Sequence, residues 1–180
     1  RLMPEKIMDI PEDMKGRVKH RAYSRWNLLH KRVHLNPDVY GTITICDEWY
    51  TYSKFKAWLT SHDDWENKHM DKDLLVPGNR HYGPDVCLLL PTAINYFIVD
   101  GKSDHLPGVS YCPKRNKSKP WFARRRYTED GVKKVQNLGY FLTELKGHLA
   151  WKEAKHKQAC RLAEGIQDQR IASALRTRYL

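Results

Sequence analysis

The sequence has few cysteines and no long apolar run, and both features exclude certain classes of protein. Its four cysteines lie far apart and none forms a C-x-x-C pair, which argues against a zinc finger. No apolar segment approaches the roughly 20 residues needed to span a bilayer. The first residues are polar and lack the pattern of a secretory signal. We therefore expect reduced thiols, no membrane partner and a cytoplasmic location.

The positive charge of the chain is concentrated in one region. The formal net charge is +11, and residues 113–161 carry 14 Lys/Arg against 4 Asp/Glu. Residues 1–112 carry 15 of each and are neutral overall. This division predicts two modules, of which the basic one suits a polyanion, most commonly a nucleic acid. We expect no small-molecule substrate.

The patterns in the neutral part predict a mixed α+β module. Apolar residues recur every three or four positions over 16–34, which predicts a helix with one buried stripe. Residues 1–15 are predicted to form a flexible arm, and residues 100–107 a linker. The remaining predicted elements are a strand at 42–46, a helix at 54–60 capped by Ser53, strands at 70–76 and 86–90, and a helix at 91–98.

The basic part is predicted to be a three-stranded sheet followed by a helix. The strands are expected at 109–112, 121–127 and 133–138. Thr143 is a good N-cap for a helix that extends to residue 163. Leu145, Leu149, Lys152 and His156 mark one stripe of this helix. A short helix at 168–179 is expected in the tail, residues 164–180.

The middle strand carries the most informative pattern. Strand alternation places Arg124 and Arg126 on one face, together with Phe122. If the helix covers the opposite face, the two arginines project outward about 7 Å apart and fit base edges or phosphates. The preceding loop supplies further cations for phosphates: Lys114, Arg115, Lys117 and Lys119. The alternative is that these arginines only form a solvated face of a basic protein. The aromatic residues interleaved with them favour contact with a nucleic acid.

Several short motifs in this part resemble those of the AP2/ERF DNA-binding domain. They are Gly108-Val109, Trp121-x-Ala123-Arg124, Leu138-Gly139-Tyr140-Phe141-x-Thr143 and Ala150-Trp151. The resemblance covers about residues 108–160 and implies a sheet, packed on one helix, that reads the major groove. It places Arg124 and Arg126 at DNA-contacting positions. Ser110, Cys112, Val135 and Asn137 stand where plant members carry Arg or Trp, so the target sequence does not transfer.

Residues 70–98 suggest a site for a hard cation. Asp71 and Asp73 are two apart and would share a strand face, while Asn95 lies on the following helix. Carboxylate and amide oxygens are the ligands that Mg²⁺ prefers. The alternative is structural, with both aspartates ending a strand and pairing with Lys72 or Arg80.

The same segment resembles the HNH (ββα-metal) core of phage homing endonucleases. The resemblance rests on Met70-Asp71-Lys72-Asp73, Tyr82-x-Pro84-Asp85-Val86-Cys87 and Asn95. It implies that Asp71 and Asn95 bind Mg²⁺ or Mn²⁺. The family's general-base histidine falls on Lys72, and a protonated lysine is a poor base near pH 7. His69 and His81 are the alternative bases.

Together these resemblances imply an HNH-like module over 16–99 and an AP2-like module over 108–163. The predicted function is that of a phage-type endonuclease which binds double-stranded DNA and cuts or nicks it with a divalent metal. One alternative is a catalytically degenerate HNH-fold protein with a DNA-binding or regulatory role. Another is a phage protein that inhibits a host factor by protein contact. The expected location is the host cytoplasm. The sequence does not decide whether the protein forms a homodimer.

Overall fold

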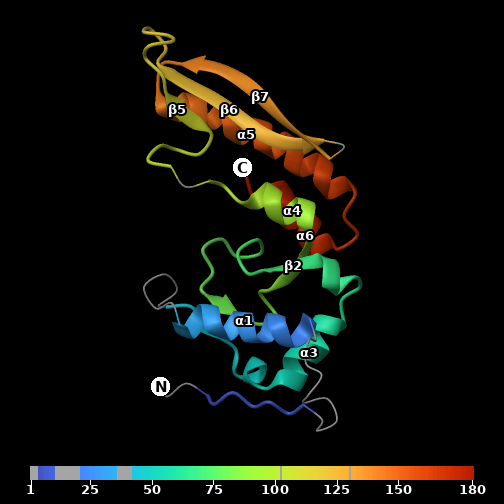
Figure 1. Cartoon of the computed structure of the whole chain (residues 1–180). Helices are drawn as coiled ribbons and strands as arrows, with labels where there is room; N and C mark the ends of the chain where they lie inside the picture. Colours follow the sequence, from blue (N-terminus) through green and yellow to red (C-terminus); the bar gives the residue numbers. More distant parts are fainter. Residues whose placement is uncertain (1–3, 11–20, 36–41, 102, 130) are drawn as a thin grey trace. The chain divides into compact units, whose positions relative to one another are not determined.

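The chain is an α+β protein that divides into two compact units, Arg1–Thr92 and Ala93–Leu180 (Figure 1). The computed structural model describes residues 4–10, 21–35, 42–101, 103–129 and 131–180. In these ranges no helix combines the length and apolar character needed to cross a membrane. The unit boundary precedes the predicted linker at 100–107, which therefore lies inside the C-terminal unit.

The N-terminal unit combines helices with two small sheets. Strand β1 pairs in parallel with β3, and β2 pairs antiparallel with β4. Its core is aromatic, with Trp26, Trp49 and Phe55 at most 1% exposed. The elements are α1 (Arg21–Leu35), β1 (Thr44–Ile45), the 3-10 helix η2 (Asp47–Tyr50), α3 (Tyr52–Thr60), the 3-10 helix η3 (Trp65–Asn67), β2 (Lys68–Asp71), β3 (His81–Tyr82) and β4 (Leu88–Pro91).

The helix expected at 16–34 is confirmed from residue 21, and its first residues fall outside the described ranges. The strand expected at 70–76 is wrong beyond Asp71. The Asp71 carboxylate accepts hydrogen bonds from the backbone N–H groups of Asp73 (2.9 Å) and Leu74 (2.7 Å), which turns the chain out of β2. Asp71 and Asp73 therefore do not share a strand face.

The described part of the predicted flexible arm is docked on the N-terminal unit. The backbone of Ile7 bonds to Tyr50 O (2.9 Å) and to Tyr52 N (3.0 Å), and Ile10 is buried. The Asp9 carboxylate accepts from the backbone N–H of Ser53 at 2.9 Å. Asp9, rather than Ser53, thus satisfies a backbone donor at the start of α3. Residues 1–3 and 11–15 of the expected arm lie outside the described ranges.

A buried histidine makes the N-terminal unit sensitive to acid. His30 is 2% exposed, and its Nε2 lies 3.1 Å from the Trp49 carbonyl oxygen. Its Nδ1 is buried without a hydrogen-bond partner in the described part of the chain. The pKa of His30 is lowered to about 4, mainly by burial, with Lys6 and His34 acting in the same direction and the hydrogen bond to Trp49 opposing them.

We expect the free energy of unfolding to fall as the pH drops from 6.5 towards 4. The unfolded chain binds a proton at His30 near pH 6.5, whereas the folded unit resists protonation until about pH 4. This difference corresponds to about 3 kcal/mol. Urea unfolding followed by tryptophan fluorescence at both pH values measures it. His30→Phe should flatten the dependence in this window, and an unchanged pH dependence in that variant would contradict the assignment.

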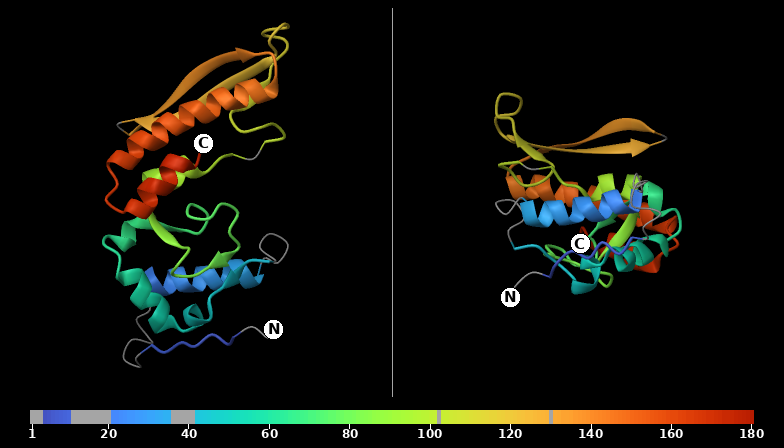
Figure 2. Two further views of the ribbon diagram at one scale, coloured as in Figure 1. Left: turned by 180° about the vertical axis from the view of Figure 1, so that it is seen from behind. Right: turned by 60° about the horizontal axis from the view of Figure 1, so that its bottom comes forward.

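The C-terminal unit is a three-stranded antiparallel sheet, in the order β5-β6-β7, packed against one long helix. Figure 2 shows the sheet lying along one side of α5 in both views. The predicted sheet and helix are confirmed, and Thr143 caps α5 by accepting from the backbone N–H of Lys146. The elements are α4 (Thr92–Ile98), β5 (Val109–Tyr111), β6 (Trp121–Glu129), β7 (Val132–Phe141), α5 (Glu144–Glu164) and α6 (Gln169–Thr177).

Small residues bring α5 close to the sheet. A side chain on Gly147 would place its Cβ 2.5 Å from Val109, so only glycine allows this approach. The predicted stripe is wrong, because Leu145 and Leu149 are 57% and 52% exposed. The buried face of α5 instead consists of Gly147, Trp151, Lys155, Ala159 and Ala163. The tail is part of this unit, since α6 packs against α5 and buries Ile171, Ala172 and Leu175.

Candidate functional site

One face of the sheet buries Ala123 against α5, and the opposite face of the strands is named the outer face. On the inner face, with the fully buried Ala123, Arg125 donates to Gln158 of α5. Strand alternation then places Arg124 and Arg126 on the outer face, where both are exposed, as the sequence predicts. The residues of the outer face are Ser110, Phe122, Arg124, Arg126, Thr128, Lys133, Val135, Asn137 and Tyr140.

A β-bulge sets which residues of β7 join this face. The register shifts between Ala123 and Arg124, so that Leu138 has no partner on β6. Beyond the bulge Arg124 stands opposite Asn137 and Arg126 opposite Val135. Bulges re-aim side chains in this way at functional sites. Arginine and asparagine thus lie side by side, and both are residue types that read base edges in the major groove.

The outer face carries no carboxylate among its described residues. The one acidic residue in β6 and β7 is Glu129, which alternation places on the inner face. Its carboxylate accepts from Lys134 Nζ at 2.5 Å, and this hydrogen bond lowers the pKa of Glu129. Arg124 and Arg126 form no ion pair with any residue of the described ranges. Their charge is therefore available to an external anion.

The inner arginine has a different role. The Arg125 guanidinium donates to Gln136 at 2.6 Å and to Gln158, and it lies 4.6 Å from the ring of Tyr127. Burial lowers its pKa, and these two hydrogen bonds use two of its five N–H donors. Arg125 therefore joins the sheet to α5.

The loop between β5 and β6 presents further cations beside this face. Its ends are joined by a hydrogen bond from Cys112 N to Pro120 O (2.7 Å), and Asn116 Oδ1 accepts from the backbone N–H of Lys119 (2.9 Å). The loop is thus held by its own backbone and amide contacts. The predicted phosphate-binding residues are all exposed: Lys114, Arg115, Lys117 and Lys119.

Sequence reasoning missed Lys133, which stands opposite Thr128 on the outer face. If the alternation of β7 is counted back from Tyr140, the bulge at Leu138 shifts it by one residue and places Lys133 on the wrong face. The turn at Glu129 and Gly131 is the signal that could have placed it, because pairing counted from a hairpin turn does not cross the bulge.

The predicted catalytic residues in the β2–β3 segment hold that segment together. Lys72 Nζ donates to Asp73 Oδ1 and to the carbonyl oxygen of Asn79, both at 2.7 Å. The Asn79 side chain in turn donates to the carbonyl oxygens of Lys72 (2.9 Å) and His81 (2.7 Å). These contacts and the Asp71 turn support the structural alternative, in which the aspartates end a strand and pair with Lys72 or Arg80. The pair that forms is Lys72 with Asp73.

The two candidate bases are separated from each other in the same unit. His69 lies on β2 and is exposed, whereas His81 lies on β3 with its Nδ1 2.8 Å from Thr44 Oγ1.

The Mg²⁺ or Mn²⁺ site predicted at Asp71 and Asn95 stays a prediction. Asp71 belongs to the N-terminal unit and Asn95 to the C-terminal unit. No group of three or more His, Cys, Asp or Glu side chains that could hold a metal ion occurs within the described ranges. A divalent cation needs more oxygen ligands than one carboxylate that already accepts two backbone hydrogen bonds.

Comparisons of this chain with protein-family models, with curated proteins and with solved structures gave no match.

Proposed function

We propose that this protein binds double-stranded DNA through the outer face of the C-terminal sheet. The observation that carries the proposal is an exposed β-surface on which, among the residues that the structure describes, there is no carboxylate and Arg124 and Arg126 form no ion pair. A β-ribbon such as the β6–β7 pair fits the major groove, where arginine donates to guanine and asparagine bonds to adenine. Asn137 beside Arg124 supplies the second of these residue types.

The β5–β6 loop adds the electrostatic part of the interaction. Its four exposed cations can contact about four phosphates. Neutralising that number gives a slope of roughly −3.6 for log affinity against log salt. Between 50 and 200 mM salt the affinity should then fall by about 150-fold.

Fluorescence anisotropy with a labelled random duplex tests the proposal. We expect binding at 50 mM salt and the steep salt dependence given above. No measurable binding at 50 mM salt would contradict DNA binding and favour docking of the basic unit on an acidic protein partner.

A metal-dependent endonuclease is the second candidate function. The observation that favours it is the order of elements, since the antiparallel pair β2–β4 is followed directly in the chain by α4. This is the ββα order that the HNH resemblance implies. No cleavage step is assigned to individual atoms, and Asp71 is the residue whose charge the activity would need.

We expect that, if the protein nicks supercoiled plasmid with Mg²⁺ or Mn²⁺, Asp71→Asn abolishes the activity. The amide oxygen of asparagine can still accept from the backbone N–H groups of Asp73 and Leu74, so the turn is kept while the charge is removed. Asp85→Asn, an exposed carboxylate of the same segment, is the matched control. Nicking that persists in Asp71→Asn would place the activity elsewhere, and no nicking with either metal would leave DNA binding as the function.

A further inference from the structure

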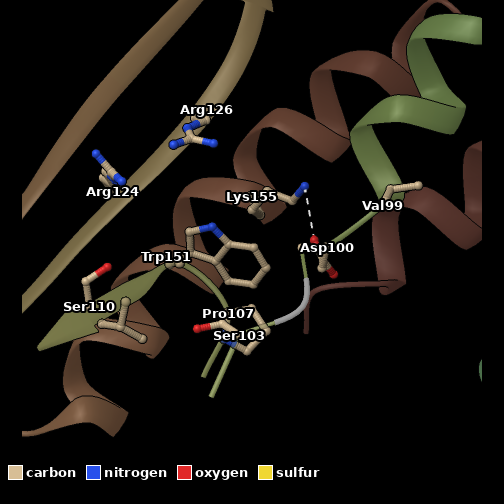
Figure 3. Close-up of a pocket in the computed structure, with 12 residues that line it drawn as sticks. Val99, Asp100, Ser103, Pro107, Ser110, Arg124, Arg126, Trp151 and Lys155 are labelled. Atoms are coloured by element: carbon tan, nitrogen blue, oxygen red, sulfur yellow. Dashed lines mark ion pairs between the residues drawn. The ribbon is translucent and has the colours of Figure 1, made fainter. Parts of the chain in front are cut away.

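A pocket of about 540 Å³ lies within the C-terminal unit, beside the proposed DNA-binding face. Arg124 and Arg126 of β6 line one part of it, and Trp151 and Lys155 of α5 line another (Figure 3). Asp100, in the segment after α4, supplies the carboxylate. Three cationic side chains and one anionic side chain therefore face a single space, which suits an anionic ligand.

The unusual residue of this pocket is Lys155, which is 6% exposed. Its Nζ lies 4.0 Å from the ring centre of Phe97, 4.9 Å from that of Tyr179 and 5.5 Å from that of Trp151. It donates to the Phe97 carbonyl oxygen and lies 3.5 Å from Asp100 Oδ1.

Burial increases the neutral fraction of this amine, although the ammonium stays the main form at pH 7. Burial is the largest effect and lowers the pKa of Lys155 to about 8, with Arg178 and Arg125 acting in the same direction and Asp100 opposing them. The hydroxyl of Tyr179 also contacts Asp100 Oδ1, at 3.5 Å. At pH 7 the neutral fraction of such a lysine exceeds that of an ordinary lysine on the order of a hundredfold.

The neutral amine of Lys155 can also keep the polar contacts that Nζ makes in the structure. It retains two N–H donors, which match the Phe97 carbonyl and the Asp100 carboxylate, and it gains a lone pair. Removing an ammonium from water costs free energy, and the cation–π contacts with three rings and the ion pair with Asp100 offset that cost only in part, since the pKa is still lowered. A desolvated lysine with a specific charged neighbour, in a pocket, is the arrangement found at imine-forming sites.

We propose that Lys155 is a nucleophilic amine that forms an imine with an aldehyde bearing a phosphate group, which Arg124 and Arg126 bind. The lone pair of Nζ attacks the carbonyl carbon, so that a C–N bond forms as the C–O π bond breaks. Two protons pass from nitrogen to the oxygen, with Asp100 as the carrier, and the oxygen leaves as water. The products are one imine and one water, and no oxidant or reductant is consumed.

Two sources supply this chemistry. One is an abasic site in DNA, whose ring-opened sugar is an aldehyde between two phosphates, and this source rests on the proposed DNA binding. The other is a free phosphorylated aldehyde, which requires only the pocket. Since the arginines belong to both the outer face and the pocket, the two sources share one recognition chemistry.

Reductive trapping tests the proposal. The native chain is incubated with cyanoborohydride, which delivers hydride to the imine carbon and makes the adduct permanent. The probe is a duplex with one abasic site in one arm and glyceraldehyde 3-phosphate in the other. Peptide mass spectrometry should find the adduct on Lys155 at least about tenfold above Lys157, an exposed lysine of the same helix, at pH 7. Its yield should rise with pH around a midpoint of about 8.

Variants and a separate binding assay distinguish the outcomes. Lys155→Arg keeps the charge and should lose the adduct, whereas Lys157→Arg should keep it, with thermal unfolding as the check on folding. An adduct on Lys155 with either probe supports the amine, and the arm that gives it identifies the source. Adducts spread evenly over surface lysines, or none on Lys155 with either probe, would overturn the proposal. Anisotropy with intact duplex reports separately on DNA binding.

Discussion

Replacing Arg124 and Arg126 together by alanine is expected to weaken binding to duplex DNA by about 100-fold or more, because each arginine contact contributes about 1–3 kcal/mol. Both side chains are exposed and make no ion pair with a described residue, so their removal should leave stability within about 0.5 kcal/mol of the native value. Anisotropy titrations at several salt concentrations measure the affinity. If the arginines contact phosphates, the salt slope should also fall by about 2.

A matched control separates position from charge. Lys146 and Arg161 are exposed cations of α5, away from the outer face. Their double alanine variant removes the same two charges and should lose less than about tenfold in affinity through the long-range field alone. Equal losses in the two double variants would show that binding follows net charge, and an affinity within about threefold of native for the arginine pair would contradict the assigned face.

The orientation of the two arginines could be predicted from the sequence for a simple physical reason. In β6 one set of alternate residues contains Ala123 with the single arginine Arg125, and the other contains Arg124 and Arg126, so one register covers one charge and the opposite register covers two. The N-cap of α5 was equally predictable, because the Thr143 hydroxyl acts within a few residues of its own position. Local chemistry decided both features.

The incorrect predictions concern features that depend on distant parts of the chain. Counting apolar residues in α5 selects Leu145 and Leu149, whereas the helix packs through Gly147 and Lys155. A sequence pattern does not assign a glycine to a buried helix face, and it assigns a lysine to the exposed face. Their burial depends on neighbours from distant parts of the chain. Similarly, the apolar residues after Asp73 resemble a strand, but the Asp71 carboxylate turns the chain.

One part of the candidate site could be predicted from local sequence, and the other part could not. The DNA-binding face follows from strand alternation, while the pocket of Lys155 brings together α4, the segment after it, β6 and α5. No sequence spacing connects Asp100 with Lys155. A long-range pair of this kind is visible only once the fold places an aromatic cluster around the amine.

The second large expected effect comes from Gly108, the residue that precedes β5. Its φ of +83° lies in the left-handed region, and a Cβ at this position would lie 2.1 Å from the ring of Trp151. Alanine there would combine backbone strain with overpacking against a buried indole. These add up to about 3 kcal/mol of lost stability.

Thermal unfolding of Gly108→Ala should therefore show the C-terminal unit melting about 10–25 °C lower than in the native chain. Gly101→Ala is the matched control, because a Cβ there meets nothing within 4 Å and should leave the midpoint unchanged. DNA affinity should fall with the folded fraction of Gly108→Ala and recover on cooling, since the arginines themselves are intact. A native midpoint in Gly108→Ala would mean that β5 and α5 do not approach each other as closely as the structure describes, and that the outer face is not held by this contact.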